Sequence, residues 1–319
     1  MQSPQTWRDL LQTIIKKSSE KERLARAIGV SAPTFMRWIK GDETPSSHQL
    51  YLLLDEVPQH RALLRALILE EIDDFSDGIS PAFPAHILDL YNTASDEARF
   101  WTICSAIFAE ALQQLDRDQQ GLCMSVVQCM ASDDTVYCLR ECVALGTSPW
   151  NERIEQRTRF LGAESLPGHA IASGSMQFIA DSRQEAGLVA NLPEHALSAV
   201  AIPILYTNRV AGCLLIASTQ RNYFRSLTSI NLIKEYASLL TLAFASEEFY
   251  AMERIALQPM PLFQEQQPYL STLRQRIQAT WKTAFSAQHA MSYPEVQQYV
   301  WSQIAEELLH LPPSHLPSM

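Results

Sequence analysis

Two glycines, Gly29 and Gly41, frame the short stretch that most constrains the fold of the N-terminal part of the chain. Between them, Ser31 is a good helix N-cap and Pro33 is tolerated in a first helical turn, while Gly41 is suited to end the helix. The sequence therefore predicts a short helix between the glycines, preceded by another helix that Gly29 ends. Apolar faces are formed by Leu24, Ala25 and Ile28 in the first helix and by Phe35, Trp38 and Ile39 in the second.

Four segments of different character follow one another along the 319 residues. Residues 1–75 read as short amphipathic helices, and the stretch 76–85 reads as a linker because Gly, Ser and Pro are frequent there. Residues 86–250 mix helix-like and strand-like patterns, and residues 251–319 form a helical C-terminal extension. The predicted fold is multidomain, with an all-α domain, an α+β domain built on an antiparallel sheet, and α-helices at the end.

The middle segment carries two hairpin signals, at the turns Ala131–Asp134 and Thr207–Asn208. Strands flanked by helices at both ends favour an antiparallel sheet with helices on one face. The expected helices cover 88–115, 166–173 and 226–256, and the expected strands cover 121–130, 135–145, 176–181, 197–206 and 209–219.

Charge is distributed unevenly along the chain, whose formal net charge is −10. Between Arg8 and Lys40, eight basic residues stand against three acidic ones, a local charge of +5. DNA affinity follows the local neutralisation of phosphates, so the acidic total does not exclude DNA as a partner. No apolar run reaches the ~20 residues that a membrane-spanning helix needs. We see no signal peptide, and we expect a cytoplasmic protein that does not bind membranes.

The segment 22-ERLARAIGVSAPTFMRWIKGDETP-45 resembles the Cro/repressor-like (XRE) helix-turn-helix family. That resemblance implies a DNA-binding domain whose second helix enters the major groove. Arg37 is the expected base reader, because Arg can donate two hydrogen bonds to guanine. Ala32 and Pro33 occupy further base-reading positions, although their side chains cannot hydrogen-bond. The residues expected to hold phosphates are Lys21, Ser31, Thr34 and Lys40.

The order of three later segments resembles that of a GAF domain, a fold that senses small ligands. They are 166-LPGHAIASGSMQFIAD-181, 199-AVAIPILYTNRVAGCLLIAS-218 and 223-YFRSLTSINLIKEYASLLTLAFA-245. The resemblance implies a pocket between the sheet and residues 146–195, and end helices that are often used for dimerisation. The candidate pocket residues are Trp150, Arg153, Phe160, His169 and Phe178, although core aromatics and an exposed histidine explain them as well.

Six cysteines lie in the middle of the chain, and no Cys-x-x-Cys pair is present, so no metal site is expected. Cys129, Cys138 and Cys142 fall on the first expected hairpin. They are either apolar strand residues or a redox-sensing cluster.

Together these features predict a DNA-binding transcriptional regulator, modulated by a signal sensed in the GAF-like domain. The expected partners are double-stranded DNA, a second copy of the chain in a homodimer and a small-molecule effector, while the sequence names no cofactor. Because no phosphate loop, nucleophile elbow or zinc-protease motif is found, we expect no enzymatic activity. Two alternatives stay open: a thiol-based redox regulator, and a protein-interaction scaffold whose helix-turn-helix no longer binds DNA.

Overall fold

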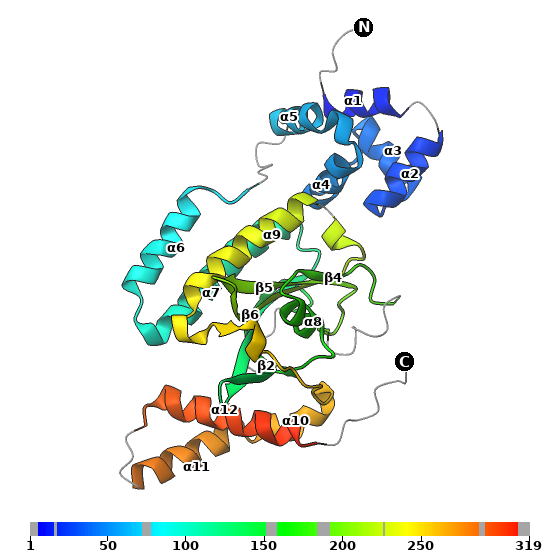
Figure 1. The fold of residues 1–319 in the computed structure, drawn as a ribbon. Coiled ribbons are helices and arrows are strands. Elements are labelled where there is room, and N and C mark those ends of the chain that lie inside the picture. Colours follow the sequence, from blue (N-terminus) through cyan, green and yellow to red (C-terminus); the bar gives the residue numbers. More distant parts are fainter. Residues whose placement is uncertain are drawn as a thin grey trace.

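A computed structural model describes residues 6–15, 18–71, 78–150, 158–183, 192–225, 227–286 and 291–311. Within these ranges the N-terminal part consists of helices that share one apolar core (Figure 1). The expected helix between the two glycines is confirmed. The helices are α1 (Trp7–Ile14), α2 (Ser18–Ile28), α3 (Ala32–Lys40), α4 (Ser47–Glu56) and α5 (Arg61–Glu71), with a 3-10 turn at Pro58–His60 before α5.

The central part is built on an antiparallel sheet, as expected, with strand order β3-β2-β1-β6-β5-β4 and β7 beside β6. Both predicted hairpins are present. Their two-residue turns, Asp133-Asp134 and Thr207-Asn208, have positive φ at both positions, which matches the twist of the flanking strands. The strands are β1 (Leu122–Ser132), β2 (Thr135–Gly146), β3 (Phe160–Leu161), β4 (Gln177–Ile179), β5 (Ser198–Tyr206), β6 (Arg209–Ser218) and β7 (Tyr250–Ala251).

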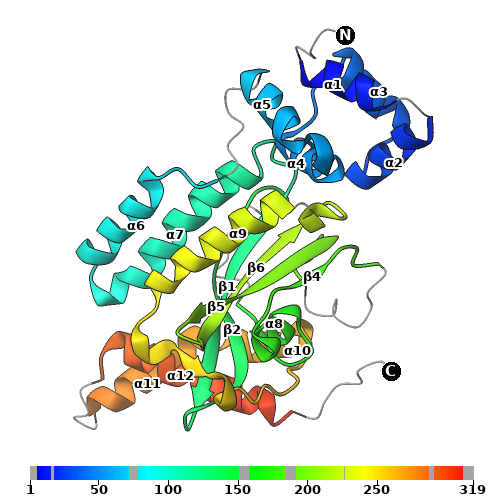
Figure 2. The ribbon, with the colours of Figure 1, turned by 45° about the horizontal axis from the view of Figure 1, so that its top comes forward.

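Helices cover both faces of this sheet, so the expectation of helices on one face was wrong (Figure 2). Leu214 and Ile216 of β6 pack with the long helices on one face, whereas Cys213 and Leu215 pack with α8 on the other. The cause is visible in β6, where nearly every residue is apolar, as in a strand buried on both faces. The helices are α6 (Ala82–Thr93), α7 (Asp96–Leu115) and α9 (Leu227–Leu239) on the first face and α8 (Leu166–Ser173) on the second.

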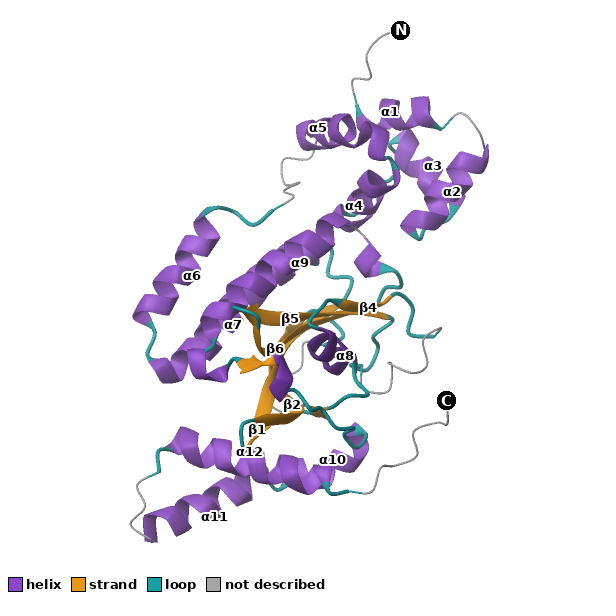
Figure 3. Ribbon diagram, viewed as in Figure 1, coloured by secondary structure: helices purple, strands orange, loops and turns teal. Residues whose placement is uncertain are grey.

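The C-terminal extension packs against the turn end of the β1–β2 hairpin (Figure 3). Met130 and Cys138, which pair across that hairpin, share a core with Phe160 and the last helix. The predicted apolar face of that helix is confirmed by Val296, Val300, Ile304 and Leu308, all buried. The helices are α10 (Phe263–Ser271), α11 (Leu273–Ser286) and α12 (Tyr293–Leu309).

Two of the long predicted helices are interrupted. The helix expected over 226–256 was wrong: α9 ends at Leu239, and 3-10 turns then lead into β7. Phe244 and Phe249 are both buried, and residues five apart point to different sides of a helix, so the chain has to turn to bury both rings. The helix expected over 88–115 is two helices, α6 and α7, separated at Ala94, whose backbone is extended. Because α6 begins at Ala82, it takes in part of the expected linker.

The N-terminal helices touch the central part where α4 packs against α9 (Figure 1). Tyr223, just before α9, has its pKa raised first by burial and then by the nearby Asp116 and by Tyr51 of α4. None of the described helices is both long and apolar enough to pass through a membrane.

Candidate functional site

Helix α3 is held in place by both of its ends and by its apolar face. The Ser31 hydroxyl accepts a hydrogen bond from the Thr34 N–H (3.2 Å), and Gly41 ends the helix in the left-handed conformation with φ 84°. Phe35 and Trp38 are buried and meet edge to face, with ring centroids 6.0 Å apart. The opposite side of the helix is therefore fixed toward solvent.

Three of the side chains predicted to meet DNA lie on this outward surface. Pro33, Arg37 and Lys40 are exposed, and Ala32 and Thr34 are half-buried. Of the remaining predicted residues, Ser31 is exposed at the helix start, and Lys21 is half-buried on α2. The structure thus gathers Pro33, Arg37 and Lys40 on the outward face of α3, whereas Ala32 packs against the N-terminal core.

The Arg37 guanidinium is engaged rather than free. Its Nε lies 3.1 Å from Oε2 of Glu43, and its Nη2 donates to the Thr34 hydroxyl at 3.4 Å. The side chains of Arg37 and Glu43 keep 58% and 43% of their surface exposed, so the ion pair is weak and easily exchanged for another partner. Glu43, which was not among the predicted site residues, pairs with the predicted base reader and would compete with DNA for it. Because Glu43 follows the helix-ending Gly41 by two residues, the sequence already placed a carboxylate near the end of the helix that carries Arg37.

The five residues predicted to line a ligand pocket do not share one surface. Trp150 is buried and donates from Nε1 to the Glu194 carbonyl (2.7 Å). Phe160 is buried against Trp301 of α12, with ring centroids 5.9 Å apart. The others are His169 and Phe178, both exposed, and Arg153, which lies outside the described residues.

A buried ion pair on β2 was not predicted. Glu141 Oε2 lies 2.8 Å from Arg159 Nε, and Oε1 lies 3.0 Å from Nη2, so the contact is bidentate. Both residues are buried. Burial alone would lower the pKa of Arg159, but the Glu141 carboxylate more than offsets this, and the pKa lies above its usual value. One signal for such a pair was present in the sequence, because Glu141 lies inside the largely apolar strand 135-TVYCLRECVAL-145 and a buried glutamate is usually paired. This signal does not identify the partner.

The three cysteines considered for redox sensing are free thiols; Cys129 and Cys138 are buried, and Cys142 is half-buried, with its thiol 3.2 Å from Gln128 Oε1. Cys129 packs in the core beneath α8, whereas Cys138 packs beneath α12. Burial raises the pKa of Cys138 to about 12 and raises those of Cys129 and Cys142. The thiolate is the reactive form, so these surroundings disfavour oxidation and do not support the redox alternative.

Comparisons with known proteins give a likeness of fold only. No family model and no curated protein matches the chain. Among solved structures, the GAF domain of an Acinetobacter phosphoenolpyruvate-protein phosphotransferase is similar at 14% identity and a TM-score of 0.37, over 52% of this chain and 93% of that one. The central sheet with its helices thus resembles a GAF-like fold, and at this score the likeness says nothing about what the chain binds.

Two further similar structures are free methionine-R-sulfoxide reductases. The Thermoplasma acidophilum protein is 16% identical with a TM-score of 0.36, over 49% of this chain and 98% of that chain. The Neisseria meningitidis protein is 15% identical with a TM-score of 0.36, over 58% of this chain and 90% of that chain. They correct our expectation that the chain is not an enzyme, because proteins described as reductases share this kind of fold. The lack of a familiar catalytic motif therefore does not exclude catalysis.

Proposed function

We propose that the chain is a DNA-binding regulator that reads DNA with the outward face of α3. The observation that carries this proposal is the placement of Arg37, Lys40 and Pro33 together on the exposed side of a helix whose other side is anchored in a core. A helix presented in this way fits the major groove, where arginine can recognise guanine.

The local charge supports the same proposal. In the described part of the first 40 residues, the basic side chains include Arg8, Arg23 and Arg26 besides those on α3. Arg8 also braces α3, because its Nε donates to the Trp38 carbonyl at 3.0 Å. The acidic remainder of the chain lowers non-specific affinity for nucleic acid, so specific binding depends on this one basic region.

The central part is the proposed sensor, and a homodimer is the proposed active form. Two copies would place two α3 helices on half-sites about one DNA turn, ~34 Å, apart. The sensor role is supported by the sequence resemblance to GAF domains. A ligand would act by binding one arrangement of the two heads more tightly than another.

The test is DNA binding by fluorescence anisotropy, with a labelled fragment from upstream of the protein's own gene. Arg37→Ala should cost about 1–3 kcal/mol of binding free energy and relax sequence preference. Lys40→Ala should weaken binding to all sequences alike. The slope of log affinity against log salt concentration should become shallower by about 1, as expected for the loss of one phosphate contact. Arg209→Ala, which removes an exposed arginine from the β5–β6 turn, is the matched control and should change nothing. No salt-dependent affinity of the wild-type protein for this DNA would overturn the proposal, whereas affinity that falls with salt and collapses in Arg37→Ala would rule out the scaffold alternative.

A further inference from the structure

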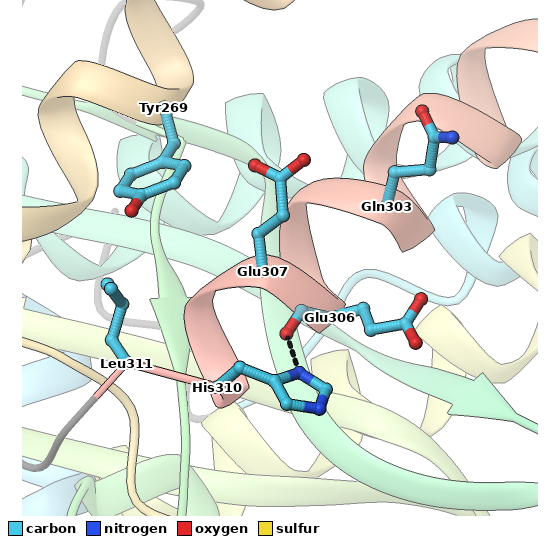
Figure 4. A pocket seen from close by; sticks show the side chains of 6 residues that line it. All are labelled: Tyr269, Gln303, Glu306, Glu307, His310 and Leu311. Atoms are coloured by element: carbon cyan, nitrogen blue, oxygen red, sulfur yellow. Dashed lines mark hydrogen bonds between the residues drawn. The ribbon is translucent and has the colours of Figure 1, made fainter.

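Two neighbouring grooves lie against the last turns of α12, far along the chain from the proposed DNA-binding face. One, of about 590 Å³, is lined by Tyr269, Gln303, Glu306, Glu307, His310 and Leu311 (Figure 4). The other, of about 530 Å³, lies between α12 and the end of the β1–β2 hairpin. Gln303, Glu306 and His310 line both grooves, so a single ligand that contacts these residues can reach either groove. Volumes of this size suit a small organic molecule.

The carboxylates are the formally charged side chains that line the two grooves among the described residues. Two carboxylates, Glu306 and Glu307, line them, and no lysine or arginine does so among the described residues. Arg276 neutralises Glu307 through contacts of 2.6 and 2.8 Å. The Glu306 carboxylate is exposed, points away from Glu307 and meets no cation in the described chain (Figure 4). The Glu306 carboxylate therefore leaves one negative charge at the boundary between the two grooves.

The backbone and a histidine add further acceptors. The grooves adjoin the C-terminal end of α12, where the helix dipole is negative and favours cations. His310 Nδ1 lies 2.7 Å from the Glu306 carbonyl oxygen, which places the ring proton on Nδ1. The other ring nitrogen of a neutral His310 is then an acceptor.

Aromatic and aliphatic side chains surround these acceptors. Tyr269 lines the first groove, and Tyr137 and Tyr299 line the second beside Met130 and Leu309. A tyrosine face attracts an organic cation, and the aliphatic groups cover an apolar body. This combination of acceptors and aromatic rings, with no lysine or arginine among the described lining residues, favours a cationic ligand over an anionic one.

From these observations we propose that the grooves beside α12 bind an organic ammonium ion that carries an apolar arm. The ammonium group pairs with Glu306, and the arm packs among Tyr137, Tyr299 and Leu309. The site belongs to the C-terminal extension and the hairpin that it covers, so it is independent of the proposed DNA contact and of the GAF-like pocket region.

Three compounds with the same indole body and different charge test this proposal. Binding of tryptamine (cation), tryptophol (neutral) and indole-3-acetate (anion) to the full-length protein is measured by calorimetry at pH 7, without DNA. Tryptamine should bind about two- to fivefold more tightly than tryptophol, the size expected for an exposed charge pair, and indole-3-acetate should bind least. Equal affinities for the cation and the anion, or no measurable binding of tryptamine, would overturn the proposal.

Variants then locate the site. Glu306→Gln should remove the preference for tryptamine over tryptophol, whereas Glu97→Gln, an exposed glutamate of α7, should leave it unchanged. Ser302→Trp places a ring in the second groove and should abolish binding of all three compounds. Because Glu306 is exposed, its variant tests the idea even if Ser302→Trp does not fold. Unchanged tryptamine selectivity in Glu306→Gln would refute the assignment.

Discussion

The Arg37–Glu43 ion pair makes a sharp prediction about DNA affinity, because the proposed base reader must leave Glu43 in order to reach a base. Replacement Glu43→Gln removes the competing carboxylate and also a negative charge that would face the phosphates. Both side chains are largely exposed at a separation of 3.1 Å, so the pair is worth ~0.2–1 kcal/mol. Its removal should tighten DNA binding by about 1.4- to 5-fold.

The assay is anisotropy with the upstream DNA fragment, combined with a double-mutant cycle. In the Arg37→Ala background, Glu43→Gln should give a smaller gain, since the ion pair is already absent and only the repulsion between Glu43 and the phosphates is relieved. Glu97→Gln is the control for a change in total charge. Weaker binding by Glu43→Gln would refute the reasoning. An undiminished gain in the Arg37→Ala background would show that only general repulsion was relieved.

Three further predictions concern stability. Trp38→Ala empties a fully packed site and should cost ~3–5 kcal/mol of unfolding free energy, which urea unfolding followed by circular dichroism checks; a loss under ~1 kcal/mol would contradict this. Glu141→Gln leaves the Arg159 charge buried without its carboxylate and should also cost ~3–5 kcal/mol, whereas Glu141→Leu with Arg159→Met should restore much of it. Burial raises the thiol pKa of Cys138 to about 12. Between about pH 8.5 and 12 this thiol therefore keeps its proton in the folded state and loses it in the unfolded state. The contribution of Cys138 to stability is therefore complete below about pH 8 and should fall as pH rises from the unfolded pKa of about 8.5 toward 12; Cys138→Ala should make the fall in stability less steep, and the other buried thiols should keep part of it.

Local chemistry made the N-terminal helices predictable from sequence. Ser31 caps α3, and Gly29 and Gly41 adopt positive φ, as their positions at helix ends suggested. The hairpin turn at Thr207-Asn208 could be found in a similar way, because two polar residues separate two apolar strands and asparagine tolerates the left-handed conformation. Each of these features depends on residues close together in the chain, which is why a single sequence was enough.

Tertiary contacts account for most of what the sequence did not predict. The pattern over 226–256 continues a helix beyond Leu239, but burial of Phe244 and Phe249 stops it. The partner of Glu141 is 18 residues away, and no local pattern points to it. The periodicity of α3 alone was enough to predict the candidate DNA face. The candidate ammonium site could be recognised only once α12 was placed against the β1–β2 hairpin.

The proposed regulation has a structural constraint in the contacts of α9. This helix packs against α4 of the N-terminal part and also against β5 and α7 of the central part. Ile233 and Tyr236 fix it to the sheet core, and the Tyr236 hydroxyl donates to Gln114 of α7 at 2.6 Å. A ligand that alters the sheet can reorient the DNA-binding part only if α9, or the segment before α6, has two arrangements that the ligand distinguishes. A helix held on three sides moves as a unit, so a change at the sheet would reach α4 as a displacement of the end of α9.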